Sequence, residues 1–438
     1  MTRVGVVRQA PTYEPGVVRE SVAAALAHAG IQLKSFAAPG MRVVVKPNFI
    51  RQSHSSRPDE WEQIITHGTV IAAVAREIAR AMEGNGTLTI ADGPQTDSDF
   101  SLIRERTGLD RLEEEFRRDY PRLDFRIMDL RREKWTTAGG VVVERRRLPD
   151  APGGYVEVDL GENSSFEGKT ARYYGADYDT AFTQRNHTSG RHAYLLAKLA
   201  LDADLFVNIP KLKTHKKVGV TLSLKNLVGI NGDKNYLPHF SMGSAEEGGD
   251  ESPYAGVAAG LQSRGIQAFK NAMHRVPAAG RILGPLAKRV GGAVFGRTED
   301  VIRSGNWYGN DTAWRMVLDL NKILFHYDGS GRRRAKPLRY LSIVDGIIAG
   351  EGNGPMEADA KPCGLILAGT NPVAVDLVGA TLMDFDWRKI PIIREAFNET
   401  RLPLTDFRPE DVSAVPELGK PFQFRAHFGW TGHIEASP

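Results

Sequence analysis

The stretch VNIPKLKTHKKVGVTLSLKNLVGI, residues 207–230, places five lysines and a histidine directly after a short apolar run. Lysine is among the residues least often buried, so this much charge at the end of a predicted buried strand calls for a partner. In an extended chain Lys211 and Lys213 point to one face, and His215 continues that face. The pattern predicts that a small anion, a phosphate or a carboxylate, binds beside the end of this strand.

The second half of the stretch is expected to be helical. The apolar spacing of residues 219–229 is typical of a helix, and Thr221 and Lys225, four residues apart, would share one of its faces. Lys216 and Lys217, between the strand and this helix, are expected to point to solvent.

Length and composition limit the classes of protein. The chain has 438 residues, 41% of them hydrophobic, which is enough for a large α/β domain or for two domains. Lys and Arg number 57 against 53 Asp and Glu, so any preference for anions must be local. Cys363 is the single cysteine, so no internal disulfide, four-cysteine zinc site or iron–sulfur cluster is expected. With no signal-peptide pattern and no apolar run of 18 residues, the protein is expected to be cytoplasmic.

Short apolar runs alternate with helical patterns along the chain. The runs are rich in Val, Ile and Leu without strict alternation, which is typical of buried parallel strands. Strands are predicted at residues 42–45, 88–90, 205–209, 340–344 and 365–367, and helices at 18–30, 70–82 and 194–203. This order predicts an α/β fold with a doubly wound, mostly parallel sheet that carries charged and helical insertions.

The chain is expected to divide into three parts. Residues 1–150 form an N-terminal α/β part with a charged elaboration at 101–150. Residues 151–400 form a second α/β part, which carries the PKLKTH and EGNGP blocks and a helical insertion at 254–300. Residues 401–438 form a C-terminal extension.

Polar side chains follow every predicted strand. In open α/β sheets ligands bind outside the carboxyl ends of the strands, so these side chains are expected to line one crevice. The set comprises Lys46, Asn48, Asp92, Lys211, Lys213, His215, Asp345, Glu351, Asn353 and Asn371. For a single strand, ordinary polar turn residues explain the pattern equally well. For five strands together, a shared binding site is the better interpretation.

The residue types suggest a role for each candidate. The predicted ligand-binding groups are Lys46, Asn48, Lys211, Lys225, Asn226, Asn353 and Arg315. The predicted catalytic groups are His67, His215, Asp92, Lys213 and Asp345. Carboxylates at Glu351, Asp376 and Asp345 could hold a divalent metal ion, or could instead pair with the lysines, and no spacing identifies the metal.

Three candidates have simple structural alternatives. His67 precedes a predicted helix, so Thr66 or Thr69 could cap that helix with His67 merely nearby. Arg315 ends the aromatic segment SGNWYGNDTAWR, which could hold a sugar or, more simply, pack against the sheet. Residues 254–296 could contact a membrane or a partner, or could form an insertion that packs on the core or mediates oligomer formation.

Four blocks of sequence resemble a known family. VVVKPNF, IPKLKTH…GVTLSLKNLVGI, VDGIIAGEGNGP and NPVAVD, in this order over roughly residues 40–380, are similar to domain-of-unknown-function family 362. The C-terminal FGWTGHIE resembles members found near surface-polysaccharide genes. The resemblance implies an α/β fold and a site built from these blocks, without a settled reaction. Some relatives carry a ferredoxin-like cysteine module, and this chain departs from them because it has a single cysteine. Lactate racemase is a more distant analogy, at the level of the fold.

These features favour an enzyme that acts on an anionic small molecule, such as a sugar derivative. Isomerase, lyase and transferase chemistry all fit, while the lack of a Walker A loop and of a GxGxxG fingerprint argues against routine use of ATP or dinucleotides. The alternative is a nucleic-acid or polyanion binding protein that uses the lysine block and the Arg-rich 101–150 region. No aromatic residues are interleaved with the lysines of 211–217, so bases lack a stacking platform there, which favours the enzyme.

Overall fold

The computed structural model describes most of the chain. The described residues are 1–138, 141–175, 179–188, 190–254 and 302–436. Most of the predicted insertion, from residue 255 to residue 300, lies outside them, as does the surface proposed for membrane or partner contact. Within the described ranges, no helix combines the length and the apolar character that a bilayer-spanning helix requires.

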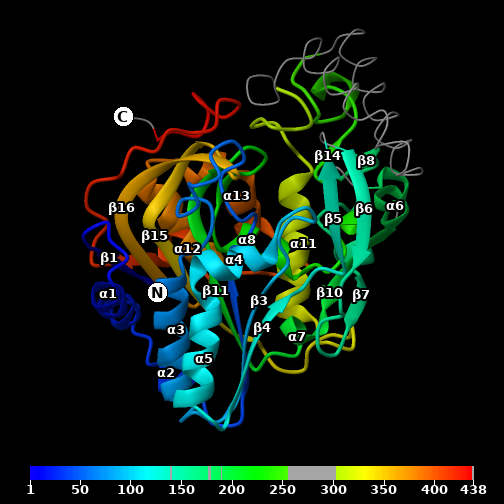
Figure 1. Cartoon of the computed structure of the whole chain (residues 1–438). Helices are drawn as coiled ribbons and strands as arrows, with labels where there is room; N and C mark the ends of the chain where they lie inside the picture. The colour runs from blue at the N-terminus through cyan, green and yellow to red at the C-terminus, as the bar shows by residue number, and fades with distance from the viewer. Residues whose placement is uncertain (139–140, 176–178, 189, 255–301, 437–438) are drawn as a thin grey trace.

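One large sheet forms the centre of the molecule (Figure 1). Its strands run in the order β17-β1-β16-β15-β11-β2-β3-β4, while β12 pairs with β15 and β13 pairs with β12. The strands are β1 (Thr2–Arg8), β2 (Arg42–Pro47), β3 (Gly86–Asp92), β4 (Leu123–Asp129), β11 (Leu205–Ile209), β12 (Lys211–His215), β13 (Gly219–Thr221), β15 (Arg339–Asn353), β16 (Glu357–Gly369) and β17 (Val412–Val415). The sheet therefore joins strands from both ends of the chain.

Most neighbouring strands of this sheet are parallel. β15, β11, β2, β3 and β4 form one parallel block, which contains four of the five predicted strands. The fifth predicted run, residues 365–367, lies in β16, which pairs antiparallel with both β15 and β1. The expectation of a parallel strand there was wrong, because only residues 354–356 separate β15 from β16 and so short a connection permits only antiparallel pairing.

Helices cover both faces of the sheet, which confirms the doubly wound α/β fold. One face packs against α1 (Pro15–His28), α3 (Gly68–Ala81) and α5 (Leu109–Asp119), and the other against α11 (Ala313–His326), α12 (Pro372–Leu382) and α13 (Pro391–Asn398). The shorter helices are α2 (Leu33–Phe36), α4 (Phe100–Thr107), α6 (Thr180–Asn186), α7 (Lys198–Leu201) and α8 (Ser223–Asn226).

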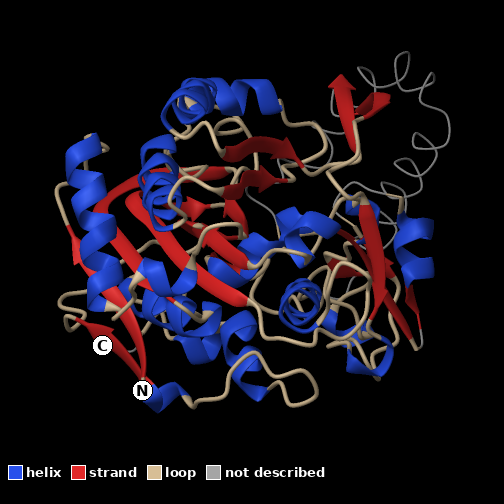
Figure 2. Cartoon of the chain, turned by 90° about the horizontal axis from the view of Figure 1, so that it is seen from below, coloured by secondary structure: helices blue, strands red, loops and turns tan. Residues whose placement is uncertain are grey.

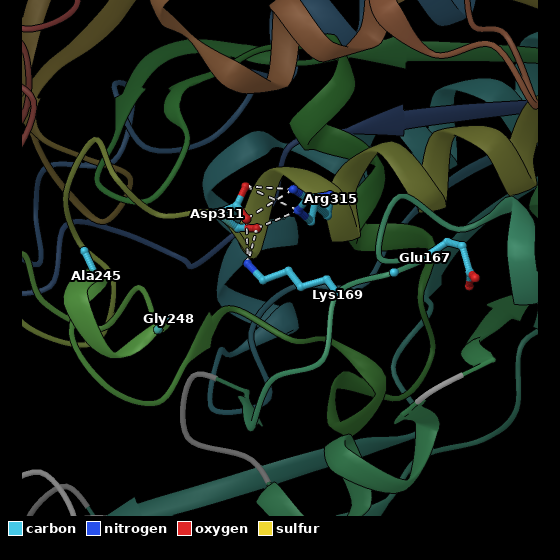
Figure 3. A pocket seen from close by; sticks show the side chains of 8 residues that line it. Glu167, Lys169, Ala245, Gly248, Asp311 and Arg315 are labelled. Carbon is cyan, nitrogen blue, oxygen red and sulfur yellow. Dashed lines mark hydrogen bonds and ion pairs between the residues drawn. The ribbon is translucent and has the colours of Figure 1, made fainter.

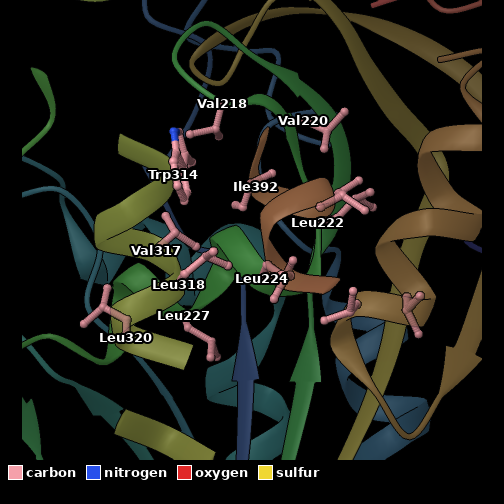
Figure 4. Close-up of a cluster of buried hydrophobic side chains, with 14 of the residues drawn as sticks. Val218, Val220, Leu222, Leu224, Leu227, Trp314, Val317, Leu318, Leu320 and Ile392 are labelled. Carbon is pink, nitrogen blue, oxygen red and sulfur yellow. The ribbon is translucent and has the colours of Figure 1, made fainter. Parts of the chain in front are cut away.

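The alternation of side chains along a strand decides which helical layer each residue meets. Val43 and Val45 of β2 pack with the α1 and α3 layer, whereas Val44 packs with the α11 to α13 layer. Figure 4 shows part of the second layer, where Val317 and Leu318 of α11 belong to the same buried cluster as Leu224 of the lysine-bearing segment. The segment after β12 thus packs against an apolar core.

Three small sheets lie to one side of the central sheet (Figures 1 and 2). They contain β5 (Glu133–Ala138) with β6 (Val141–Arg147), β7 (Tyr155–Asp159) with β10 (Arg191–Ala197) and β9 (His187–Thr188), and β8 (Tyr173–Tyr174) with β14 (Phe240–Ser241). The charged segment 101–150 thus holds a hairpin of its own besides α5 and the sheet strand β4.

Two predicted helices were wrong over part of their length. Residues 194–203 form the end of β10 and the short α7, because β10 finds an antiparallel partner in β7 that overrides local helix preference. Residues 219–229 begin as β13 and only then form α8 and a 3₁₀ turn at Leu227–Ile230. Gly219 has a φ of +82° and pairs with His215, so the chain reverses into a hairpin before any helix begins.

Candidate functional site

A buried ion pair joins the carboxyl ends of β2 and β3. Lys46 Nζ lies 2.7 Å from Asp92 Oδ1, and both side chains are almost fully enclosed. Asp92 Oδ2 also accepts a hydrogen bond of 2.6 Å from the backbone N–H of Phe49. Burial lowers the pKa of Lys46, and the neighbouring carboxylate opposes this effect. The predicted meeting of these two strand ends is confirmed.

Gly229 lies directly against this ion pair. A Cβ atom at Gly229 would be 1.7 Å from Asp92 Oδ1 and 2.7 Å from Lys46 Nζ. The Gly229 carbonyl accepts a hydrogen bond of 2.8 Å from the N–H of Gly93, which fixes the turn over the pair. Gly229 is the last residue of the predicted helix 219–229, and its lack of a side chain is what lets the turn close on the two charges.

A chain of asparagines extends the site from β2 to β15. Asn226 Oδ1 accepts from Lys46 Nζ at 3.1 Å and from Asn48 Nδ2 at 2.9 Å, and Asn226 Nδ2 donates to Asn208 Oδ1 at 2.6 Å. Asn208 in turn donates to the hydroxyl of Tyr340 at 2.8 Å. Asn48 Oδ1 is buried and has no hydrogen-bond partner among the described residues. An acceptor left unpaired in a buried position is uncommon in folded proteins.

A second buried ion pair joins β12 to β15. Lys211 Nζ lies 2.8 Å from Asp345 Oδ2, and both side chains are fully enclosed. Tyr13 completes the group, since its hydroxyl accepts from Lys211 Nζ at 2.9 Å and donates to Asp345 Oδ1 at 3.0 Å. Burial, reinforced by the charge of Asp345, raises the pKa of Tyr13 well above its usual value. Asp345 lies inside the long strand β15 rather than at its end, so pairing with β12 brings it to the site.

His67 is itself the cap of α3, so the alternative in which Thr66 or Thr69 caps this helix was wrong. Its Nδ1 accepts a hydrogen bond of 3.1 Å from the N–H of Thr69, and its Nε2 lies 3.6 Å from Glu62 Oε1. The ring stacks on Tyr13 at 3.6 Å between centroids, and burial lowers its pKa to about 4. The imidazole is therefore neutral at pH 7 and is held beside the pair formed by Lys211 and Asp345.

Three further lysines have no carboxylate partner among the described residues. Lys213 Nζ donates to the carbonyl of Ile64, and Lys234 Nζ donates to the carbonyl of Val228 at 3.1 Å. Lys225 has no hydrogen-bond partner within the described parts of the chain. Burial lowers all three pKa values, that of Lys213 well below its usual range, that of Lys225 to about 8 and that of Lys234 to about 7.

His215 lies on the same strand as Lys211 and Lys213. β12 is extended as predicted, so Lys211, Lys213 and His215 alternate with Leu212, which is part of the core. His215 Nδ1 accepts a hydrogen bond of 3.1 Å from the N–H of Lys217, which places the proton of the neutral ring on Nε2. Burial, together with the charge of the adjacent lysines, holds the pKa of His215 well below its usual value.

The prediction that Lys217 points to solvent was wrong. Its side chain is buried and donates to the carbonyl of Ser304. The two segments are about ninety residues apart in the chain, so no local sequence pattern indicates this contact. Lys216 is partly exposed, and its carbonyl accepts a hydrogen bond from the indole N–H of Trp430 at 2.9 Å.

The lowered lysine pKa values predict how stability depends on pH. An amine with a pKa of about 8 or 7 in the folded state and about 10.4 when unfolded binds more protons in the unfolded state over that interval. The free energy of unfolding is therefore expected to rise from pH 7 to pH 9, by up to about 1.4 kcal/mol per pH unit for each amine. Urea unfolding at pH 7, 8 and 9 measures this slope, and Lys225→Met is expected to flatten it.

Two predicted asparagines have structural positions. Asn371, which follows the antiparallel β16, caps α12 through hydrogen bonds from Val373 N at 2.8 Å and Ala374 N at 3.2 Å. Asn353 ends β15 and pairs with Glu357 at the tip of the β15–β16 hairpin. Asn371 thus has the role of an ordinary polar turn residue.

Arg315 belongs to a different cavity, of about 460 Å³ (Figure 3). Asp311 lies between two cations there, with its carboxylate 2.7 Å from Lys169 Nζ and 3.1 Å from Arg315 Nη2. Glu167 also lines this cavity. Both of its cations are paired with Asp311, so the Arg315 guanidinium is held in this cavity by a partner of its own.

Each of the three carboxylates predicted to bind a metal ion interacts with a different partner in the protein. Glu351 pairs with Lys361 at 2.8 Å, and Asp345 is held by the β12 lysine. Asp376 accepts hydrogen bonds from the N–H groups of Ser223 and Leu224 at 2.7 and 2.9 Å, and burial raises its pKa to about 7. Nowhere in the described residues do three or more His, Cys, Asp or Glu side chains meet in a group that could hold a metal ion.

Four features of the candidate site were not anticipated: the side chains of Tyr13, Asn208 and Lys234 and the close approach of Gly229. Asn208 carried a usable signal, because an amide in the middle of the apolar run LFVNI must find buried partners. Tyr13 lies in a loop and Lys234 begins a short 3₁₀ turn, Lys234–Tyr236, and only the packing of these two segments brings their side chains to the site.

Comparison with known proteins gives three kinds of match. A family model described as a domain of unknown function (DUF362) matches residues 158–381. A thylakoid-associated protein from Synechocystis sp. is 23% identical over 399 residues, which is 90% of this chain and 80% of that protein.

Two solved structures are also similar. A protein from Thermotoga maritima shares 10% identity with a TM-score of 0.34, over 82% of this chain and 56% of that one. The lactate racemase apoprotein from Thermoanaerobacterium thermosaccharolyticum shares 12% identity with a TM-score of 0.33, over 88% and 57%. The chain thus spans a little over half the length of each of these two proteins.

The family model covers more than half of the chain and contains both β12 and β15, with the lysine-bearing segment between them. It also includes Asn226 and Gly229, which contact the ion pair at the ends of β2 and β3. The chain therefore belongs to the family defined by the domain of unknown function DUF362.

Proposed function

We propose that the five lysines Lys46, Lys211, Lys213, Lys225 and Lys234, here called the lysine cluster, bind a small anion, and that the protein is an enzyme acting on that anion. The observation that carries the proposal is the imbalance of buried charge. Two members of the cluster are paired with carboxylates, and three have none among the described residues. Buried ammonium groups without counter-charge are costly, and a phosphate or carboxylate removes that cost.

The cluster has an inner and an outer layer. Lys46, Lys211 and Lys213 are at most 1% exposed, whereas Lys225 is 7% and Lys234 is 6% exposed. Asn48 is 8% exposed. A ligand therefore contacts the outer lysines and Asn48, and the inner lysines act on it through their charge at low effective dielectric.

The same burial favours a small molecule over the alternative of a nucleic acid. A phosphodiester backbone is neutralised by Lys and Arg side chains that reach out to it. Lys211, Lys213 and Lys217 are enclosed, so the lysine block cannot follow a polymer along the surface.

Two orphan polar atoms support a ligand that carries hydroxyl groups. Asn48 Oδ1 and Thr221 Oγ1 are buried without hydrogen-bond partners in the described residues, and Thr221 is paired with Lys213 across β12 and β13. A sugar phosphate or a hydroxy acid would supply both the anion for the lysines and hydroxyl groups for these atoms.

The site also holds groups for proton transfer. His215 offers Nε2–H, and the group formed by Lys211, Tyr13 and Asp345 can accept or donate a proton through short hydrogen bonds. Isomerisation, elimination and group transfer all need such groups beside a bound anion. We propose reactions of this kind on a hydroxylated anion, of the sort that sugar metabolism provides.

A thermal-shift measurement at pH 7 tests the proposal with inorganic phosphate, glycerol 3-phosphate and lactate. At 100 times its dissociation constant a ligand stabilises the folded state by about 2.7 kcal/mol, which raises the melting temperature. Lys213→Met and Lys225→Met are expected to reduce this shift by more than half, because each removes a cation of the cluster.

Lys361→Met is the matched control, because it deletes a lysine whose Glu351 partner lies outside the cluster. It is expected to leave the shift unchanged. The proposal fails if none of the three anions stabilises the protein, or if all three variants respond alike. Tight binding of duplex DNA with a steep dependence on salt would favour the nucleic-acid alternative instead.

A further inference from the structure

Lys225 is the one lysine of the cluster whose amine has no hydrogen-bond acceptor in the described parts of the chain. Lys213 and Lys234 donate to backbone carbonyls, and Lys46 and Lys211 are held by carboxylates. An amine that is buried yet free of acceptors is not needed to hold the fold. It is available to a ligand.

The surroundings of Lys225 favour its neutral, nucleophilic form. Burial is the main cause that lowers its pKa to about 8, and the charge of Lys46 adds to it. A lysine in water, with a pKa of about 10.4, is almost entirely protonated at pH 8 and cannot attack. Desolvation beside a second cation is a known way to activate a lysine for covalent chemistry.

We propose that Lys225 Nζ forms an imine with the carbonyl carbon of an anionic aldehyde or ketone held by the rest of the cluster. This inference rests on the proposed function, since the remaining lysines must bind the anionic group of the same molecule. It narrows the ligand from any small anion to one that bears a carbonyl group as well.

The step balances without an oxidant or a reductant. The amine lone pair attacks the carbonyl carbon and a C–N bond forms, while the electrons of the C=O π bond move to the oxygen. The oxygen takes up a proton to become a hydroxyl group, and the nitrogen loses its first proton. The hydroxyl takes up a second proton and leaves as water as the nitrogen lone pair forms the C=N bond, and the nitrogen then loses its second proton. One amine and one carbonyl thus yield one imine and one water.

His215 is suited to supply the proton to the carbonyl oxygen. Among the charges that act on its ring, that of Lys225 has the largest effect, and the β12–β13 hairpin that carries His215 leads directly into α8, which carries Lys225. Its neutral ring carries the proton on Nε2, since Nδ1 accepts from the N–H of Lys217. The imidazole can therefore act as the acid beside the attacking amine.

Reductive trapping tests the inference. The intact protein is incubated at pH 8 with dihydroxyacetone phosphate or with pyruvate in the presence of sodium cyanoborohydride, which converts an imine into a stable secondary amine. Peptide mass spectrometry is expected to find the adduct on Lys225 at no less than ten times its level on Lys361. Lys225→Arg keeps the positive charge but cannot form the imine, so it is expected to lose the adduct and to keep the thermal shift with glycerol 3-phosphate.

The non-carbonyl analogues glycerol 3-phosphate and lactate separate this inference from the proposed function. If they stabilise the protein and neither carbonyl compound modifies Lys225 selectively, the covalent step is overturned and the anion site stands. If no compound of the four stabilises the protein and no selective adduct forms, both proposals fall. His215→Asn is expected to slow trapping at least tenfold, and an unchanged rate would remove His215 from the step.

Discussion

Asp92→Ala is expected to lower the free energy of unfolding by about 3–5 kcal/mol, because it leaves the ammonium group of Lys46 buried without a counter-charge. The same change removes the acceptor of the Phe49 N–H, which is also buried. Urea unfolding at pH 7, with the m-value fitted for each variant, measures the loss.

A matched surface pair provides the control. Arg42 and Asp204 are 3.2 Å apart but exposed, so Asp204→Ala is expected to cost about 1 kcal/mol or less. Adding Lys46→Met to Asp92→Ala removes the stranded charge and is expected to recover part of the lost stability. Equal losses for Asp92→Ala and Asp204→Ala would contradict the assignment of a buried, charge-balanced pair.

Gly229→Ala is the second change with a large expected effect. Its Cβ would overlap Asp92 Oδ1, at 1.7 Å, so either the turn or the ion pair must move. Overpacking of this kind costs about 1–3 kcal/mol, and displacement of the pair adds to that cost. Because the turn also carries the carbonyl of Val228 that binds Lys234, the affinity for glycerol 3-phosphate is expected to fall at least tenfold.

A substitution at the adjacent Val228 tests whether the effect comes from this steric overlap or from a general loss of stability in the turn. Val228→Ala shortens a partly buried side chain and leaves the backbone carbonyl in place. It is expected to change ligand affinity less than twofold in the thermal-shift titration. A loss of affinity as large as that of Gly229→Ala would show that contact with the ion pair is not what makes Gly229 necessary.

The elements that could be predicted from sequence are those with strong local signals. The runs at 42–45, 88–90, 205–209 and 340–344 are too apolar and β-branched to be anything but buried strands. The antiparallel direction of β16 and the secondary structure of residues 194–203 could not be predicted from such local signals. Both depend on which strand becomes the partner, a choice made by contacts distant in sequence.

The residues of the candidate site also divide into those that a local sequence signal identifies and those that it does not. Lys46, Asp92 and Lys211 could be identified because each directly ends or follows a strand, where the fold gathers polar groups. Arg315 could not be excluded from the site, since its aromatic surroundings suit a ligand as well as they suit packing. Its partner Asp311 is only four residues away, yet the cavity that they share depends on a separate loop, residues 167–169.

The sequence by itself determined an α/β fold, the strands that build its parallel block, and a concentration of lysine, asparagine and aspartate at their carboxyl ends. These follow from periodicity and from residue type, which act over a few positions. Only the tertiary structure decided which lysines acquire a carboxylate and which do not, because Asp345 reaches Lys211 across 134 residues and Asp92 reaches Lys46 across 46. The electrostatic energy of a buried charge depends on distance in space and on desolvation, neither of which is encoded at the position of the residue alone.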